Sequence, residues 1–376
     1  MAHEFLRPTL RDSRAGASVS AVPGAPRLLF VPVSGPTGMG EYFQSLAIAQ
    51  AAQHRWPDAA IHFLLNRNAP YAARTPFEAT LLPSSPTFHT PEVVAAISTF
   101  RPDVVVFANA GRTAQFHAAR AAGAAVVFIS YRRRKRLKAA RLRWMRLIDE
   151  HWIAFPRFIS GGPVPFERFN RWLCGKPAPR YLDIVLPPLQ AGHVAPPAGG
   201  AAAVASPVLV VPGGGAAPPN APDAPSRFRS AAVLLAEAGV PTVYVGPGEG
   251  PQPQGLSTHR FLPQHELFAL MRGARLVVTN GGQTLLQAVA CGVPCVAAPI
   301  NRDQPIRVRR CAQAGVAVPA RLDAADIAAT ARGVIEDEPR RQAMIGHIAA
   351  LSLADGAQVS VDALAGLLAR HRHAAP

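Results

Sequence analysis

Residues 279–315, TNGGQTLLQAVACGVPCVAAPINRDQPIRVRRCAQAG, contain the pattern that decides the fold of this 376-residue chain. The apolar run 276–278 predicts a strand, a glycine pair follows as a turn, and residues 283–291 have the composition of a helix. A second apolar run, 294–298, predicts a neighbouring strand that leads into a polar loop. Parallel strands bring such loops to one edge of an open α/β sheet, where nucleotide phosphates bind.

Short apolar runs alternate with helical patterns over most of the chain, which indicates repeated parallel βαβ units. Further strands are expected at 27–33, 60–65, 103–108, 125–130, 151–155, 208–211, 241–245 and 259–262. Helices are expected at 41–53, 91–100, 113–122, 226–238 and 359–370. The chain length suits two domains of ordinary size, so we predict an α/β protein of two Rossmann-like, doubly wound domains facing a cleft.

A change in composition divides the two halves. Residues 187–207 are mainly Pro, Ala and Gly without periodicity, which is typical of a linker. We therefore expect a flexible tail at 1–26, a first domain at 27–186, the linker at 187–207, a second domain at 208–356, and a closing helix with a tail at 357–376.

The chain is strongly basic, with a net charge of +16 and an isoelectric point near 11. Such a charge attracts phosphates on nucleic acids, anionic lipids or nucleotides. The apolar stretches are shorter than the roughly 18 residues that a membrane span needs, and the N-terminal residues lack the apolar core of a secretory signal. The four cysteines show no metal-ligand spacing, so we expect reduced thiols and a cytoplasmic protein.

Two glycine-rich turns follow predicted strands and are candidates for binding phosphate. Backbone N–H groups at the start of a helix attract anions, and glycine lets the backbone approach a phosphate closely. One such turn alone would favour a simple chain reversal, whereas two turns at strand ends favour a phosphate site. The candidate residues are Gly213, Gly214, Gly215, Gly281, Gly282, Gln283 and Thr284.

The polar loop after the second strand carries Asp303 and Gln304 in the pattern P-x-x-x-D-Q. Carboxylate and amide groups can hydrogen-bond sugar hydroxyls, which are both donors and acceptors. The alternative interpretation is that both are ordinary polar residues of a solvent-exposed loop without a role in binding. Their spacing after the G-V-P of residues 292–294 favours a sugar site.

The order G-G-x-T-x-x-Q-A, G-V-P, P-x-x-x-D-Q and A-G resembles the donor-sugar motif of GT-B glycosyltransferases. Over about residues 27–318 the chain loosely resembles the family-28 type, whose bacterial members convert lipid I to lipid II. The resemblance implies that the second domain binds a nucleotide diphosphate sugar, with a UDP-sugar the expected donor, and that the first domain binds the acceptor. Glycine turns and helix dipoles would stabilise the leaving diphosphate. We therefore expect neither a metal nor a further cofactor.

The resemblance also assigns two parts of the donor site. Gln287 stands where related transferases have an acid that holds the ribose hydroxyls. An amide there keeps one acceptor but loses the charge, so we expect the donor specificity to depart from that of the family. Phe261 and Leu262, placed at the end of a predicted strand, correspond to the segment that holds the nucleobase through backbone atoms.

In the first domain, residues 37–47, TGMGEYFQSLA, resemble the glycine loop of the same family, with one residue inserted and Glu41 in place of a histidine. An inverting transferase needs a base that takes the proton of the acceptor hydroxyl, and a carboxylate can do this. Glutamate in a first helical turn is also favoured by the helix dipole alone. His117 and Asp103 are weaker candidates for the base. The expected acceptor-loop residues are Gly38, Gly40, Gly111 and Arg112.

Residues 132–148 contain nine Lys or Arg between positions 132 and 146 without an acid. Their apolar residues recur at helical spacing, which predicts an amphipathic helix lying on an anionic membrane. In this interpretation Arg133, Arg134 and Arg136 contact head groups and Trp144 lies at the interface, so that the protein is peripheral on the inner face of the cytoplasmic membrane. A solvated basic face and an RNA-binding patch are the alternatives, although nucleic acid is disfavoured because no RNA-module motif accompanies the segment.

Two other functions remain open from the sequence. A nucleotide-sugar hydrolase or epimerase can use the same fold, with water or the sugar itself in place of the acceptor. A non-catalytic protein that binds RNA or membranes through its basic segment is the second alternative.

Overall fold

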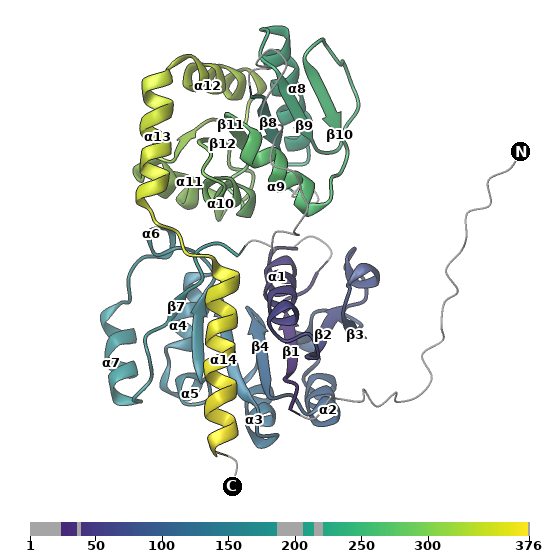
Figure 1. Cartoon of the computed structure of the whole chain (residues 1–376), viewed down its shortest axis with the longest axis vertical. Helices are drawn as coiled ribbons and strands as arrows, with labels where there is room; N and C mark the ends of the chain where they lie inside the picture. Colours follow the sequence, from purple (N-terminus) through teal and green to yellow (C-terminus); the bar gives the residue numbers. More distant parts are fainter. Residues whose placement is uncertain (1–23, 36–38, 186–205, 214–220, 375–376) are drawn as a thin grey trace, which may run out of the picture.

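A computed structural model describes residues 24–35, 39–185, 206–213 and 221–374, with side chains up to residue 370. The chain forms two α/β domains, one above the other in Figure 1. The tail, most of the linker, Gly38, Gly214 and Gly215 lie outside the described residues.

The first domain contains a seven-stranded parallel sheet with the order β3-β2-β1-β4-β5-β6-β7. Its strands are β1 (Arg27–Pro32), β2 (Ala60–Asn66), β3 (Glu78–Leu82), β4 (Val104–Ala108), β5 (Ala125–Ser130), β6 (Glu150–Ile153) and β7 (Arg180–Tyr181). Its helices are α1 (Gly40–Arg55), α2 (Thr90–Phe100), α3 (Thr113–Ala121), α4 (Arg133–Ala139), α5 (Leu142–Met145), α6 (Arg157–Ser160) and α7 (Pro165–Leu173), with short 3₁₀ turns η1 (Ala72–Arg74) and η2 (Pro86–Phe88).

The second domain contains a six-stranded parallel sheet with the order β10-β9-β8-β11-β12-β13. Its strands are β8 (Val208–Val211), β9 (Thr242–Val245), β10 (Leu256–His259), β11 (Leu276–Thr279), β12 (Cys295–Ala297) and β13 (Ala317–Pro319). Its helices are α8 (Ala224–Glu237), α9 (Gln264–Gly273), α10 (Gln283–Ala290), α11 (Gln304–Gln313), α12 (Ala324–Glu336) and α13 (Glu338–Ala350).

Both faces of each sheet are covered, as expected for strands that are apolar at every position. In β1, Leu28 and Phe30 belong to the hydrophobic cluster on one face, whereas Leu29 and Val31 belong to the cluster on the other. The cluster around Leu28 and Phe30 also contains residues of α10 and α14 (Gly356–Ala374), so one apolar core continues between the domains. The prediction of two doubly wound domains is confirmed.

The strand order of each sheet reverses direction at one point, between β1 and β4 and between β8 and β11. At such a switch point the loops after the two strands diverge to opposite faces of the sheet and leave a crevice for a ligand. The candidate residues of the first domain follow β1 and β4, and those of the second follow β8 and β11. The topology therefore places both sets at their crevices.

The last helix, α14, returns to the first domain, where it packs on α1 and lies in front of the sheet (Figure 1). The predicted closing helix is therefore present. Its start is fixed by a close backbone approach, because Gly356 donates its N–H to Ile184 O at 3.1 Å and a Cβ at this position would collide with Leu182 O. Among the described residues no helix is long and apolar enough to cross a membrane.

The predicted single helix at 132–148 is wrong. The segment forms two short helices, α4 and α5, and its apolar side faces the protein core. Trp144 is 3% exposed, packs against Phe116 and Phe128, and donates its indole N–H to Thr113 Oγ1 at 3.1 Å. Arg136 is also buried. Neither side chain can lie on a membrane, because both are buried inside the protein. Packing the apolar residues of the segment against the core removes them from water and so stabilises this orientation.

The strand expected at 259–262 lies about three residues earlier, as β10. Leu256 is its only fully buried residue and sets the register against Thr242 of the neighbouring strand. Phe261 lies in the loop before α9 and is 78% exposed. The prediction was displaced because Phe261 and Leu262 are apolar, as strand residues often are, but lie in the loop after the edge strand β10.

Candidate active site

The two domains meet at the first turns of α1 and α10. A Cβ built on Gly40 would lie 2.7 Å from Gln283 Oε1, so the backbone of Gly40 and the side chain of Gln283 approach each other closely across the two domains. The glycine loop of the first domain and the glycine turn of the second therefore lie directly opposite each other. The structure brings together two segments that are more than two hundred residues apart in the sequence.

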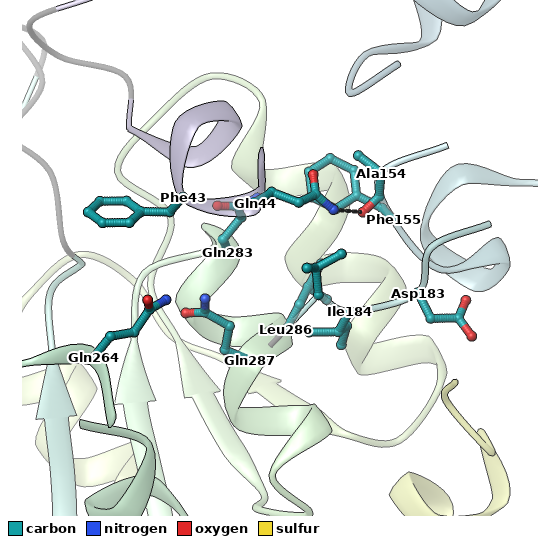
Figure 2. A pocket seen from close by; sticks show the side chains of 11 residues that line it. Phe43, Gln44, Ala154, Phe155, Asp183, Ile184, Gln264, Gln283, Leu286 and Gln287 are labelled. Atoms are coloured by element: carbon teal, nitrogen blue, oxygen red, sulfur yellow. Dashed lines mark hydrogen bonds between the residues drawn. The ribbon is translucent and has the colours of Figure 1, made fainter. Parts of the chain in front are cut away.

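A pocket lies between the domains at this point (Figure 2). Four glutamines line it: Gln44 of α1, Gln264 of α9, and Gln283 and Gln287 of α10. Figure 2 shows the carboxamides of Gln264 and Gln287 pointing toward one another. The charged residue in the lining is Asp183, which follows β7. Amides both donate and accept hydrogen bonds, so the pocket suits neutral hydroxyls and carbonyls rather than phosphates.

Gln44 has an unused acceptor in this pocket. Its Nε2 donates to Ala154 O at 3.3 Å, but its Oε1 is buried and has no hydrogen-bond partner in the described part of the chain. A buried polar atom without a partner is costly, and a ligand group that donates to it would remove that cost.

The two glycine turns of the second domain are held together by Asn280. Its Nδ2 donates to Pro212 O at 2.6 Å, and its Oδ1 accepts from the N–H of Gly282 at 2.6 Å. Gly213 has φ +121°, and a Cβ on it would collide with the Asn280 side chain. These glycines are therefore required by the packing of one loop against the other.

Gln304 has a structural role that its predicted contact with a sugar did not include. Its side chain is buried, and its Oε1 accepts from Ile300 N at 2.7 Å, Gly281 N at 3.2 Å and Asn301 N at 3.4 Å. The N–H groups of Gly281 and Gly282 are thus both engaged within the protein. The N–H groups in the first turn of α10, at Gln283 and Thr284, have no acceptor within the helix and remain the groups suited to phosphate.

Asp303 lies beside Gln304 but faces outward, with its side chain 59% exposed. Its nearest cation is Arg307, whose Nη2 lies 3.6 Å from Asp303 Oδ2. Arg307 is buried, donates to Gly281 O, and stacks its guanidinium over the ring of Phe155 in the first domain at 4.8 Å. Burial lowers the pKa of Arg307, and the Asp303 carboxylate opposes that shift. Arg307 therefore links the glycine turn to the opposite domain.

Glu41 is in the first turn of α1, facing the end of β4. Its Oε1 accepts from Asn109 Nδ2 at 3.0 Å. Asn109 has φ +57°, a left-handed conformation that asparagine tolerates better than most residues. Its backbone oxygen accepts from Lys135 Nζ at 3.0 Å, whereas its side-chain Oδ1 is buried without a partner among the described residues. A carboxylate, an amide and an ammonium thus meet at the switch point of the first sheet.

One further side chain lies beside this group, and burial shifts both its pKa and that of Lys135. The hydroxyl of Tyr131, directly after β5, is buried without a partner in the described structure. Burial raises the pKa of Tyr131 well above its usual value of 10.0, and the nearby Glu41 adds to this, so the phenol remains a neutral donor. The pKa of Lys135 is lowered, first by burial and then by the neighbouring cations Lys138, Arg112 and Arg132.

The remaining acceptor-loop candidates divide into a structural and a surface residue. Gly111 has φ +103°, and a Cβ there would lie 2.6 Å from the Phe116 ring, so it serves the packing of α3. Arg112 is exposed and donates from Nε to Thr87 O at 3.0 Å.

The two weaker candidates for the base lie elsewhere. Asp103 accepts from Arg27 N at 2.7 Å before β4 begins, at the end of the sheet away from the cleft, and His117 is exposed on α3. Neither can act as the base at the cleft.

Sequence reasoning did not identify Asn109, Asn280, Lys135 or Arg307. The two asparagines share a signal that the sequence contains, because each is the polar residue directly after a buried strand at a switch point. The two cations give no such signal, since their roles depend on atoms of distant segments. Within the described residues, no group of three His, Cys, Asp or Glu side chains is placed to hold a metal ion.

Solved structures that are similar to this chain span most of its length. CalG4, the calicheamicin glycosyltransferase, is 19% identical, with a TM-score of 0.62 over 94% of this chain and 100% of that chain. MurG of Acinetobacter baumannii is 15% identical, with a TM-score of 0.59 over 90% of this chain and 98% of that chain. The chain has the GT-B fold.

The GT-B fold is not limited to transferases. A putative UDP-N-acetylglucosamine 2-epimerase from Listeria monocytogenes is 11% identical, with a TM-score of 0.57 over 90% of this chain and 94% of that chain. No protein-family model and no curated protein sequence matches the chain. The closer resemblance to the family-28 type therefore stays a prediction, since the fold is shared with transferases that act on natural products.

Proposed function

We propose that this protein is a glycosyltransferase that moves a sugar from a nucleotide diphosphate donor to an acceptor held by the first domain. The observation that carries the proposal is the pairing of two switch points across one cleft. One has a helix start with free N–H groups at Gln283 and Thr284, and the other has the Glu41 carboxylate. A leaving diphosphate and a hydroxyl nucleophile require groups of these two kinds on opposite sides of a reacting carbon.

The donor half of the site supports a nucleotide sugar, with a UDP-sugar as the first choice. The first turn of α10 would hold the diphosphate through backbone N–H groups and the helix dipole. Gln264 and Gln287 offer amides to the nucleoside, and exposed Asp303 is free to accept from sugar hydroxyls. Backbone at Phe261 and Leu262 remains the proposed nucleobase contact. In this arrangement Gln304 organises the loop and does not need to contact the sugar.

Catalysis would follow direct displacement. Glu41 takes the proton of the acceptor hydroxyl, the hydroxyl oxygen bonds to the anomeric carbon, and the bond from that carbon to the diphosphate oxygen breaks, with inversion. Asn109 positions the carboxylate through its 3.0 Å hydrogen bond. The backbone N–H groups in the first turn of α10 would stabilise the negative charge of the leaving diphosphate, and we therefore propose a reaction without a metal.

The acceptor is proposed to be a hydroxyl compound, either a soluble molecule or one linked to a membrane lipid. Arg133 and Arg134 are exposed at the start of α4, close to Lys135 and the Glu41 site. These cations suit an acceptor that carries phosphate.

A hydrolase or epimerase is the second candidate, because the fold is shared with a putative epimerase. In both cases the donor site would be used without an acceptor. Turnover of the donor to free sugar, or to its epimer, in the absence of any acceptor would select this class.

The deciding experiment is a thermal-shift screen against UDP-, GDP-, dTDP- and CMP-sugars. A donor at about 100 times its Kd stabilises by about 2.7 kcal/mol, which corresponds to a Tm increase of roughly 5–10 °C. The matched control is Thr284→Pro, which removes an N–H from the first turn of α10 at a position where proline is compatible with a helix. We expect the variant to fold and to lose most of the shift. A wild-type protein stabilised by none of the four donors would refute the proposal.

A further inference from the structure

Helix α7 presents its apolar side to solvent. Helices of globular proteins normally bury that side and expose their polar residues. Here Glu167 and Asn170 are 5% exposed and face the protein. The exposed apolar side chains, with their exposed fractions, are Phe166 at 48%, Phe169 at 60%, Trp172 at 76% and Leu173 at 52%. Their spacing of three and four residues places them along one outward face, which we call the α7 face.

The inward polar residues fix this orientation. Arg136 of α4 donates to both carboxylate oxygens of Glu167, each at 2.7 Å, and donates further to backbone oxygens at Ser160 and Gly161. Asn170 Nδ2 donates to Ala140 O at 2.9 Å. Turning the helix over would leave a buried arginine without its carboxylate, which is strongly destabilising. The hydrogen bonds of Glu167 and Asn170 therefore hold the polar side of α7 against the protein and leave the α7 face exposed to solvent.

The surroundings of the α7 face are cationic. Residues 132–176 contain 13 Lys or Arg and three acids. All three acids are engaged: Glu167 with Arg136, Glu150 with Arg180, and Asp149 with Arg120. The cations of this segment that are exposed include Arg132, Arg133, Arg134, Arg141, Arg143, Arg146 and Arg168.

The elements that carry these cations lie next to the α7 face. Helix α5 contacts both α4 and α7, and α7 lies at the outer edge of the first domain, on the left in Figure 1. The exposed Arg141, Arg143 and Arg146, on and beside α5, and Arg168 of α7 therefore lie on segments that adjoin the α7 face.

We infer that the α7 face, with the arginines around it, docks on an anionic membrane. Aromatic side chains lie favourably at the boundary of head groups and acyl chains, and arginines bind the lipid phosphates. A second copy of this chain is disfavoured as the occupant, because two such cationic surfaces repel each other. RNA would use the cations but leave the Phe166 and Leu173 side chains without a role. The inference does not depend on the donor chemistry, so nucleotide-sugar binding and membrane docking can fail separately.

The test is cosedimentation of the full chain with vesicles of phosphatidylglycerol and with vesicles of phosphatidylcholine. We expect binding to the anionic vesicles only, weakened by salt. Trp172→Ser should reduce vesicle affinity about tenfold or more. The matched control is Phe88→Ser in η2, whose side chain is 72% exposed compared with 76% for Trp172. The control should bind as the wild type does.

Tryptophan fluorescence gives an independent readout. Trp144 and Trp152 are buried and Trp56 is half-buried at the end of α1, so Trp172, at 76% exposed, should contribute most of an emission shift to shorter wavelength on adding anionic vesicles. Trp172→Phe should retain binding and lose the shift. Equal vesicle binding by wild type and Trp172→Ser would overturn the inference. So would a wild-type dimer that Trp172→Ser converts to a monomer, or binding to RNA with none to anionic vesicles.

Discussion

Replacing Gln304 with alanine should destabilise the second domain, because one side-chain oxygen holds two loops at the end of β11 and β12. The variant removes the acceptor of the bonds from Ile300 N at 2.7 Å and Gly281 N at 3.2 Å. Each bond contributes about 1 kcal/mol, and the buried Gly281 N–H then lacks its acceptor at a further cost of about 1–3 kcal/mol. We expect a total loss of about 3–5 kcal/mol, or a Tm lower by roughly 6–20 °C.

The assay is thermal unfolding followed by circular dichroism and calorimetry. Tryptophan fluorescence alone is unsuitable, since all four tryptophans are in the first domain, before residue 186. The matched control is Asp303→Ala, the adjacent residue with a 59% exposed side chain. It should lose less than about 1 kcal/mol, because its 3.6 Å ion pair with Arg307 is long and largely solvated on the Asp303 side, yet bind the donor more weakly if Asp303 contacts the sugar.

A Gln304→Ala protein as stable as the wild type would refute the reasoning. The amide would then be free for a ligand, as the sequence pattern first suggested. Opposite results for the two neighbouring residues, with stability lost at Gln304 and donor affinity lost at Asp303, would support the structural assignment.

Three further predictions concern the first domain. Glu41→Gln keeps the contact with Asn109 but cannot take a proton, so kcat should fall about 10²–10⁴-fold with an unchanged donor-induced Tm shift; a fall below about tenfold would remove Glu41 as the base. Burial lowers the pKa of His151 from 6.5 to about 3. The unfolded chain therefore binds more protons as pH falls from 6.5 toward 3, stability is lost by up to about 1.4 kcal/mol per pH unit, and His151→Asn should flatten this loss in urea titrations. Arg136→Met leaves the Glu167 carboxylate buried without its partner and should cost about 3–5 kcal/mol, whereas replacing both residues with apolar ones should recover much of that stability.

The resemblance to the donor-sugar motif led to the correct fold and to the correct edge of each sheet. The prediction of a membrane segment at 132–148 came instead from its charge and helical periodicity. The apolar side of this segment faces inward, since periodicity identifies an apolar stripe without saying what it packs against. At 132–148 the stripe is covered by β5 and α3, and Lys138 covers the Trp144 ring at 4.2 Å from its centroid. The exposed aromatic helix is α7, where an equally clear pattern faces the other way.

The sequence by itself determined the fold class and the strands that lead into the site, because strand composition, glycine turns and helix periodicity are local properties of neighbouring residues. It therefore placed Glu41 and the 279–315 segment at strand ends. Only the tertiary structure decided which atoms are free to meet a ligand. The N–H groups of Gly281 and Gly282 are taken by Gln304 and Asn280, and Glu41 is held by a residue 68 positions away. Hydrogen bonds saturate, so the role of a polar group depends on which partners the fold brings to it first.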